Sequence, residues 1–317
     1  MTRFKQVDID KVKTLSLKRR KSLAAVNSFG KPLDSGNAKK FFKSLPGFLK
    51  AKDLMNFMER VAKARKKGFP FHVMMGAHAI KVGLTPILID LMQRKIITGI
   101  SLNSAGLIHD LELASIGRTS EDVSSGLKDG TFGMAEQTGR MFADVVEFAD
   151  RLSIGLGEAA GIYINQVNPK YKSYSLFATA DRLGLPATVH IAIGTDIVSQ
   201  QCSFRPGPAA EASYRDFKIL SNILIQADRG GVVANVGSAV VLPEVFLKAL
   251  TVSRNLVKSK CNITTANFDM IGHYRPLTNV VKRPTEKGGL GFSFTGHHEI
   301  MLPLLAWGLK SYIKKLN

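Results

Sequence analysis

The chain alternates between two kinds of apolar pattern. Short, continuous apolar runs, typical of buried strands, alternate with longer segments in which apolar residues recur every three or four positions, as on one face of a helix. The strand-like runs are residues 69–76, 96–103, 185–194, 231–237, 263–272 and 290–296. The helical segments are residues 52–67, 84–95, 134–153, 174–184, 210–229, 243–259 and 299–316. This alternation predicts βαβ units and therefore an α/β fold, with a parallel sheet covered by helices on both faces.

The turns that follow these six strands are rich in glycine and polar residues, and four of them carry His or Asp. In a parallel sheet such turns lie together beyond the carboxyl ends of the strands, where ligands bind. Glycine permits close backbone approach, and the next helix offers free N–H groups to phosphate. We therefore predict one composite ligand site, against the simpler interpretation that these residues only build turns. The turns are Gly76-Ala77-His78, Asn103-Ser104-Ala105-Gly106, Gly194-Thr195-Asp196, Gly237-Ser238-Ala239, Gly272-His273-Tyr274 and Gly296-His297-His298.

Several kinds of site are excluded because their short sequence motifs are missing. The sequence lacks a G-x-G-x-x-G turn after a strand, a phosphate-binding loop, an H-E-x-x-H helix and a G-x-S-x-G elbow. The stretch "GLGEAAG" at 155–161 follows a helical segment, so we expect a bend or loop there. Adjacent residues in a turn rarely bind one ion, so neither His109-Asp110 nor His297-His298 predicts a metal site. Instead we expect His109 and Asp110 on the first turn of a helix, facing the reaction, where a histidine can move protons.

Four stretches resemble the deoxyhypusine synthases, in the order in which that family carries them. The likeness covers about residues 70 to 310. It implies a Rossmann-like domain that binds NAD, a homotetramer with sites at dimer interfaces, and transfer of the aminobutyl group of spermidine to a lysine of a translation factor. The stretches are "GAHAIKVGLTPILIDLMQRKIITGISLNSAGLIHDLELAS", "LPATVHIAIGTDIVSQQ", "VVANVGSAVVLPEVFLKAL" and "FTGHHEIMLPLLAWGL".

The resemblance and the turn pattern together assign candidate roles. The candidate cofactor-binding residues are Gly76, His78, Lys81, Ser104, Ala105, Gly106, Asp196, Gly237, Ser238, His273 and His297. The candidate catalytic residues are His109, Asp110, His298, Lys282 and Lys287, of which the first two replace a pair of acids near the family's amine substrate.

The chain departs from the family around its catalytic lysine. That lysine, which forms an imine, should fall within "VVKRPTEKGGLG" at 280–291, which offers Lys282 and Lys287 but no tryptophan. The acids that would hold a polyamine are mostly missing, and the cations of 275–287 should repel one and attract a carboxylate or phosphate. We expect an NAD-dependent transferase or oxidoreductase that acts at a C–N or C–O centre of a small anionic substrate. The alternatives are a genuine deoxyhypusine or homospermidine synthase and a non-catalytic NAD-binding protein.

Charge divides the chain unevenly. Of a net charge of +19, residues 1–67 carry 19 Lys and Arg against 5 Asp and Glu. We therefore expect a basic N-terminal arm and helix at 1–67 and an NAD-binding domain at 68–317. The arm suits nucleic acid or an acidic partner, but the chain lacks recognised nucleic-acid-binding motifs, which favours a solvated surface. Apolar runs are too short to cross a membrane, and Cys202 and Cys261 make no disulfide framework, so we expect a cytoplasmic protein.

Overall fold

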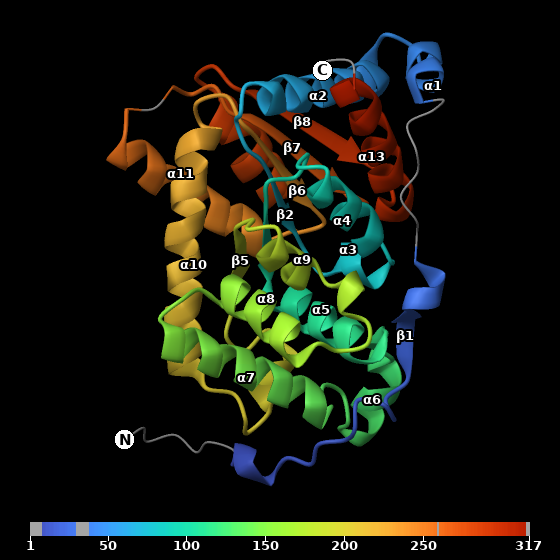
Figure 1. The fold of residues 1–317 in the computed structure, drawn as a ribbon, viewed down its shortest axis with the longest axis vertical. Helices are drawn as coiled ribbons and strands as arrows, with labels where there is room; N and C mark the ends of the chain where they lie inside the picture. Colours follow the sequence, from blue (N-terminus) through green and yellow to red (C-terminus); the bar gives the residue numbers. More distant parts are fainter. Residues whose placement is uncertain (1–7, 30–37, 259, 315–317) are drawn as a thin grey trace.

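Six parallel strands form the centre of the computed structural model, which describes residues 8–29, 38–258 and 260–314 (Figure 1). They run in the order β5-β3-β2-β6-β7-β8, so the first strand of the sheet is central, the next two lie on one side and the last three on the other. This is the strand order of the Rossmann fold. The α/β prediction is confirmed, and all six strands are where the sequence predicts them. Their bounds are β2 Phe71–Met75, β3 Gly99–Asn103, β5 Ala187–His190, β6 Val232–Val236, β7 Thr264–Asp269 and β8 Leu290–Thr295.

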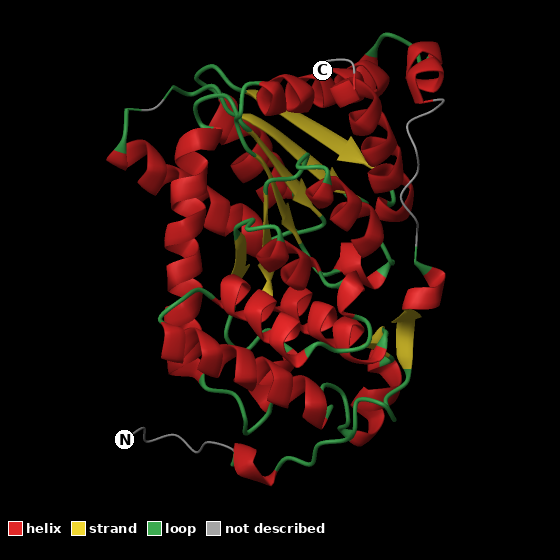
Figure 2. Cartoon of the chain, viewed as in Figure 1, coloured by secondary structure: helices red, strands yellow, loops and turns green. Residues whose placement is uncertain are grey.

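Helices cover both faces of the sheet and close a separate core on each (Figure 2). Because side chains of a strand alternate between faces, Val73 and Met75 enter one core and Met74 the other. The first core lies under α2 (Leu49–Lys66), α4 (Thr85–Gln93) and α13 (His298–Lys314). The second core lies under α10 (Pro206–Ala227) and α11 (Val241–Leu256).

A further group of helices extends the first core beyond the sheet: α5 (Ser104–Ile116), α7 (Glu136–Leu152), α8 (Leu156–Val167) and α9 (Leu176–Arg182). All seven predicted helices are present, but the expectation of a bend or loop at 155–161 is wrong, because α8 begins there. Its glycines serve close packing: a Cβ at Gly157 would collide with the backbone of Ala187 in β5, and one at Gly161 with Phe177. The remaining short helices are η1 (Ile9–Lys11), η2 (Val26–Ser28), α1 (Ala38–Ser44), α3 (His78–Lys81), α6 (Val123–Asp129), η3 (Lys172–Tyr174), η4 (Ile197–Gln200), α12 (Tyr274–Pro276), the π-helical η5 (Leu277–Lys282) and η6 (Arg283–Thr285).

The edge strand β5 is protected by side chains of α10. Asp216 accepts hydrogen bonds from the amides of Val189 (2.7 Å) and Gly157 (3.0 Å). Ser213 donates to the carbonyl of Val189 (2.9 Å) and accepts from the amide of Ile191 (3.1 Å). The contacts with Val189 occupy backbone groups of β5 that an edge strand would otherwise expose to other chains, while the contact with Gly157 ties the start of α8 to the same carboxylate. Burial raises the pKa of the Asp216 carboxyl to about 8.

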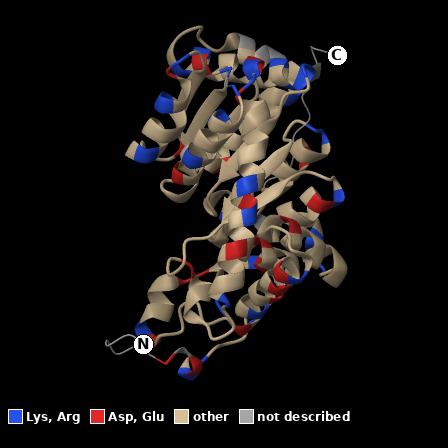
Figure 3. Ribbon diagram, turned by 90° about the vertical axis from the view of Figure 1, so that its left-hand side faces the viewer, with Lys and Arg blue, Asp and Glu red and all other residues tan. Residues whose placement is uncertain are grey.

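The described parts of the N-terminal segment pack against the rest of the chain. Strand β1 (Ser22–Ala25) pairs antiparallel with β4 (Arg118–Glu121), and Leu17 beside it is 1% exposed. In α2, Phe57 lies in the first core together with residues of the sheet such as Phe71. Packing is therefore continuous across the boundary predicted at residue 67. Lys and Arg are spread over both ends of the molecule (Figure 3). Within the described ranges, none of the helices combines the length and the apolar character needed to span a bilayer.

Candidate functional site

The carboxyl ends of β2 and β6 meet where the strand order reverses, which is the ligand-binding position of this fold. The amide of Gly76 donates to the carbonyl of Val236 (3.0 Å). A Cβ at Gly76 would collide with the carbonyl oxygen of Gly237, and a Cβ at Gly237 would lie 2.7 Å from Cε1 of His298. Gly237 also has a φ of +62°, a conformation that residues other than glycine rarely adopt. The two glycines therefore allow three elements to converge at one point.

Two histidines stand beside these glycines. The rings of His78, at the start of α3, and His298, at the start of α13, have centroids 5.4 Å apart. Nε2 of His298 lies 3.1 Å from the carbonyl oxygen of Phe268. Because a carbonyl can only accept, Nε2 carries the proton and Nδ1 is an acceptor, buried without a partner among the described residues. Burial, followed by the neighbouring His298, lowers the pKa of His78.

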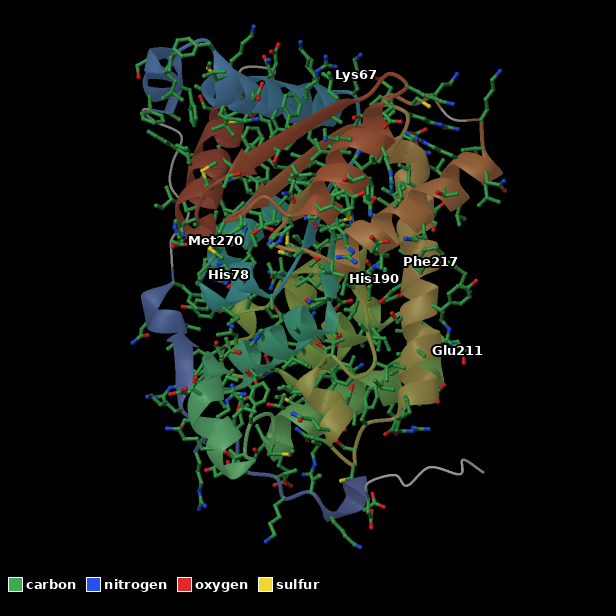
Figure 4. All side chains as sticks on the ribbon, turned by 180° about the vertical axis from the view of Figure 1, so that it is seen from behind. Lys67, His78, His190, Glu211, Phe217 and Met270 are labelled. Carbon is green, nitrogen blue, oxygen red and sulfur yellow. The ribbon has the colours of Figure 1, made fainter. Side chains whose placement is uncertain are left out.

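Asp269, the last residue of β7, adds a carboxylate to this group. Its Oδ1 accepts from the amide of Met270 (2.8 Å), while its Oδ2 is buried and has no partner within the described chain. Figure 4 labels His78 and Met270, which lie near one another although they come from opposite halves of the sequence. The electrostatic influence of Asp269 on His78 agrees with this closeness. Two unpaired, buried acceptors therefore flank the point at which the strand order reverses.

A pocket of about 170 Å³ lies at the same edge, on the side of β3 and β5. It brings together four residues that the sequence predicts for the site: Lys81, Ala105, His109 and Asp196. Ser104 donates a hydrogen bond to Asp196, which joins the turns after β3 and β5. Burial raises the pKa of Asp196, although hydrogen bonds from Ser104 and Thr195 oppose the shift. The other lining residues are Arg20, Ile108, Ser120, Glu121, Val123, Phe132, Thr195 and Ile197.

His109 is oriented by a chain of hydrogen bonds. Its Nδ1 lies 2.5 Å from the hydroxyl of Thr119, which itself donates to Glu112 (2.5 Å). Since that hydroxyl has one proton, it must accept from Nδ1–H, and Nε2 of His109 is left as an acceptor. Arg20 holds the same carboxylate in a bidentate pair, at 2.7 and 2.8 Å. Burial favours protonation of Glu112, but His109 and Arg20 outweigh it and lower its pKa to about 2.

Asp110 does not face the pocket, so the expectation that it faces the reaction together with His109 is wrong. It is fully buried and accepts from the hydroxyl of Ser175 (2.5 Å) and the amide of Leu176 (2.8 Å). It therefore holds the start of α9, and burial raises its pKa to about 6. The reason is helical geometry: one step along α5 turns the side chain by roughly 100°, so His109 and Asp110 point to different surroundings.

The predicted catalytic role of Lys282 and Lys287 is also wrong in position. Both lysines are exposed and lie away from the strand ends that form the site. The π-helical η5 turns back from the end of β7 toward the start of β8, where a Cβ at Gly291 would collide with the carbonyl of Val281. Lys287 precedes Gly289, which packs on the carbonyl of Ile263, just before β7 begins. The segment therefore ends at the amino edge of the sheet.

The other predicted residues lie at the carboxyl edge with structural contacts of their own. A Cβ at Gly106 would lie 2.6 Å from the side chain of Leu102, so this glycine lets α5 pack on β3. Ser238 accepts from the amide of Leu242 (3.2 Å), in the first turn of α11. His273 is half-buried before α12, and His297 is exposed. None of these contacts tests a role in cofactor binding.

Sequence reasoning missed Arg20, Glu112, Thr119 and Asp269. Two of them had a visible signal: Glu112 is a carboxylate three positions after His109 in an apolar helix, and Asp269 ends an apolar strand. Arg20 had none, because it lies 92 residues from its partner Glu112.

No protein-family model matches the sequence, and neither does any curated protein. Among solved structures, the chain is similar to apo ArgZ, an arginine dihydrolase from the ornithine-ammonia cycle in cyanobacteria, with a TM-score of 0.51, 14% identity, and coverage of 85% of this chain and 34% of ArgZ. It is similar to AgrE in ternary complex with ornithine and NAD+, with a TM-score of 0.51, 13% identity, and coverage of 84% and 34%. A putative deoxyhypusine synthase from Entamoeba histolytica gives a TM-score of 0.46 and 9% identity, with coverage of 87% and 95%.

The chain thus spans about a third of the length of ArgZ and AgrE (34%). At such identities the likeness shows a shared fold, and no sequence match assigns the chain to the deoxyhypusine synthases. What the fold and the strand-end geometry define is a Rossmann-like α/β domain with a polar site at the carboxyl edge of its sheet.

Proposed function

We propose that this chain is an NAD-dependent enzyme that acts at a C–N or C–O centre of a small, carboxylate-bearing substrate. The observation that carries the proposal is the junction of β2 and β6, where Gly76 and Gly237 allow close backbone approach beside the unpaired acceptors of His298 and Asp269. Buried acceptors without partners are costly, and a bound ligand with hydroxyl or amide donors would satisfy them. A dinucleotide has both kinds of donor.

NAD suits the length of this edge as well as its chemistry. In the Rossmann order each half of the sheet forms one mononucleotide-binding unit, and the dinucleotide spans both. Here the ends of β2, β3 and β5 offer Gly76, Ser104 and Asp196. The ends of β6, β7 and β8 offer Gly237, Asp269 and His298. When bound, the nicotinamide supplies the hydride acceptor or donor.

His109 is the residue best placed to move a proton. Its Nε2 is an acceptor, its ring is fixed through Thr119 and Glu112, and it lines the same pocket as Asp196 and Lys81. A base held in this way can take a proton from an N–H or O–H group whose carbon is oxidised.

The pocket also favours one class of substrate. Lys81 offers a partner to a carboxylate and Asp196 a partner to an amine, so an amino acid fits both. The AgrE complex, which holds ornithine and NAD+, supports a C–N centre. The cation that attracts the substrate is then Lys81 rather than Lys282 or Lys287. The volume of this pocket, about 170 Å³, restricts the substrate to a small molecule.

The proposal is tested by incubating the protein with NAD+ and a panel of small amino acids and hydroxy acids. Reduced nicotinamide is followed by absorbance, and products by mass spectrometry, which also detects a reaction that recycles NAD. We expect turnover that is lost in His109→Gln and Thr119→Val but retained in Thr119→Ser, which keeps the hydroxyl. Binding of NAD+ without turnover would instead indicate a non-catalytic protein, and a borohydride-trapped adduct with spermidine an aminobutyl transferase.

A further inference from the structure

A second cavity shares Arg20 with the pocket of His109 and is otherwise lined by different residues. Its volume is about 530 Å³, roughly three times that of the pocket that contains His109 (about 170 Å³). Its walls come from the N-terminal segment, the end of α5, the start of β4 and the loop before η3. Such a volume lies within the range of small-molecule sites and exceeds what a single inorganic anion fills. The polar and aromatic residues in the walls are Lys18, Arg20, Asn27, Ser115, Arg118, Lys170 and Tyr171.

The walls of this cavity are strongly cationic. Four of its lining residues are Lys or Arg, and none is acidic. Lys18, Arg118 and Lys170 are exposed and make no ion pair with any residue that the structure describes. Arg20 alone is paired with carboxylates, those of Glu112 (2.7 Å) and Glu121 (3.7 Å). Three cations without an acidic partner among the described residues favour an anionic occupant, because each would lose repulsion and gain a counter-charge. Nζ of Lys170 lies over the ring of Tyr171, 5.3 Å from its centroid, which keeps the ammonium at the wall of the cavity.

Arg20 supplies a buried donor at this position. Its side chain is only 5% exposed, and both terminal nitrogens are bound to Glu112. Its Nε is buried and has no partner within the described chain. Arg20 lines the cavity, and an unsatisfied N–H within its side chain is the kind of group that a bound anion satisfies.

Part of the negative end of α5, which lies beside the cavity, is occupied by hydrogen bonds. The last carbonyls of a helix normally present a partial negative charge. Here the carbonyl of Ala114 accepts from the amide of Tyr171 (3.0 Å), that of Leu113 from Gly117 (2.9 Å), and that of Gly117 from Val26 (2.9 Å). Two of these carbonyls, of Leu113 and Ala114, are among the last four of α5, so their hydrogen bonds reduce the partial negative charge at this helix end.

We infer that this cavity binds a small organic polyanion, one that carries two or more phosphate or carboxylate groups. Lys18, Arg118 and Lys170 contact its anionic groups, Arg20 donates from Nε, and the ring of Tyr171 packs against its body. Since Arg20 lines both this cavity and the pocket of His109, an occupant also reaches the chain Arg20–Glu112–Thr119–His109. The inference is independent of what the carboxyl edge of the sheet binds.

The test is calorimetric titration of the full chain at low salt with pyrophosphate, citrate and ATP. We expect at least one probe to bind, with an affinity that falls as salt rises. Lys170→Glu and Arg118→Glu should each weaken it by about tenfold or more, since each turns an attraction into a repulsion. Lys128→Glu is the matched control, an exposed lysine of α6 that does not line the cavity, and should bind like the wild type. Ring nitrogen resonances of His109 should shift on binding in the wild type.

The three probes distinguish the sources of the anion. Binding of citrate alone indicates polycarboxylates, binding of pyrophosphate and ATP indicates phosphates, and binding of ATP alone indicates a nucleotide. The inference is overturned if no probe binds, if the charge reversals leave the affinity unchanged, or if NAD+ displaces the bound probe competitively. NAD+ binding by Lys170→Glu at the wild-type affinity would show that the two sites are distinct, so that failure here leaves the proposed function standing.

Discussion

The guanidinium of Arg20 and the carboxylate of Glu112 form a bidentate pair, with N–O distances of 2.7 and 2.8 Å and side chains 5% and 0% exposed. The pair joins the N-terminal segment to α5. The same carboxylate accepts from Thr138 (2.8 Å) and from Thr119, which orients His109. A segment that looked like a basic arm therefore stabilises the charge behind the candidate general base.

Removing Arg20 should be far more damaging than removing its neighbour. Arg20→Met leaves Glu112 buried without its cation, and such losses cost about 3–5 kcal/mol of unfolding free energy. Lys21→Met removes an exposed pair with Asp122 (3.4 Å, lysine 76% exposed), whose loss should cost no more than about 1 kcal/mol. Urea denaturation of both variants measures the difference. Equal losses would show that the buried pair contributes no more than a surface one.

Glu112 should make the protein sensitive to acid. Its pKa is lowered from 4.5 to about 2. A lowered carboxyl pKa gives stability that is present above the unfolded pKa and lost as pH falls toward the folded pKa. The free energy of unfolding should therefore fall between about pH 4.5 and pH 2, and Glu112→Gln should show a shallower fall over that window. Parallel curves for the two proteins would rule out this source of acid sensitivity.

Asp216 should act in the opposite direction. Burial raises its pKa from 3.8 to about 8, so its protonated form is favoured by folding. The associated stability is present below the unfolded pKa and lost as pH rises through the folded pKa. Wild-type stability should therefore decline between about pH 4 and pH 8. Asp216→Asn keeps an oxygen that accepts from Val189 and removes the titration, so its curve should be flatter. A curve as steep as that of the wild type would contradict the assignment.

Substitution of Asp110 should lower stability without loss of activity, and substitution of His109 should do the reverse. Asp110→Ala removes the carboxylate that holds Ser175 and the start of α9, so its melting temperature should drop, with a loss of roughly 1–3 kcal/mol for unsatisfied buried groups. The folded fraction should keep its turnover. His109→Gln should melt close to the wild type and lose turnover. Loss of turnover in folded Asp110→Ala would return this residue to the reaction.

The strands were predictable from the sequence because strands of a parallel sheet are buried on both faces and therefore read as continuous apolar runs. The positions of the strands also gave the positions of the turns that follow them. Four residues predicted from those turns and the segments after them line one pocket: Lys81, Ala105, His109 and Asp196. Helix α8 was missed because the glycines at its start resemble loop residues, whereas Gly157 lets the helix approach Ala187 of β5 and Gly155 leaves room for Asp216 of α10.

Other parts of the site depended on orientation and on distant contacts. Whether His109 or Asp110 faces the pocket is set by where α5 begins, at Ser104, and a difference of one residue rotates the side chain away. The partner of Glu112 comes from Arg20, through a pairing of β1 with β4 that no local pattern indicates. Lys282 and Lys287 were misplaced because η5 reverses the path of the chain.

The central claim is that the carboxyl edge of the sheet binds NAD, and calorimetric titration with NAD+ tests it most directly. Gly237 and Gly184 have the same φ of +62°, but a Cβ at Gly237 would meet His298, whereas one at Gly184 would meet nothing within 4 Å. Alanine at either position therefore introduces the same backbone strain, and only Gly237→Ala changes the site. We expect NAD+ to bind the wild type and Gly184→Ala alike, and Gly237→Ala about tenfold more weakly or worse. No binding to the wild type at millimolar NAD+, or equal binding to all three proteins, would contradict the claim.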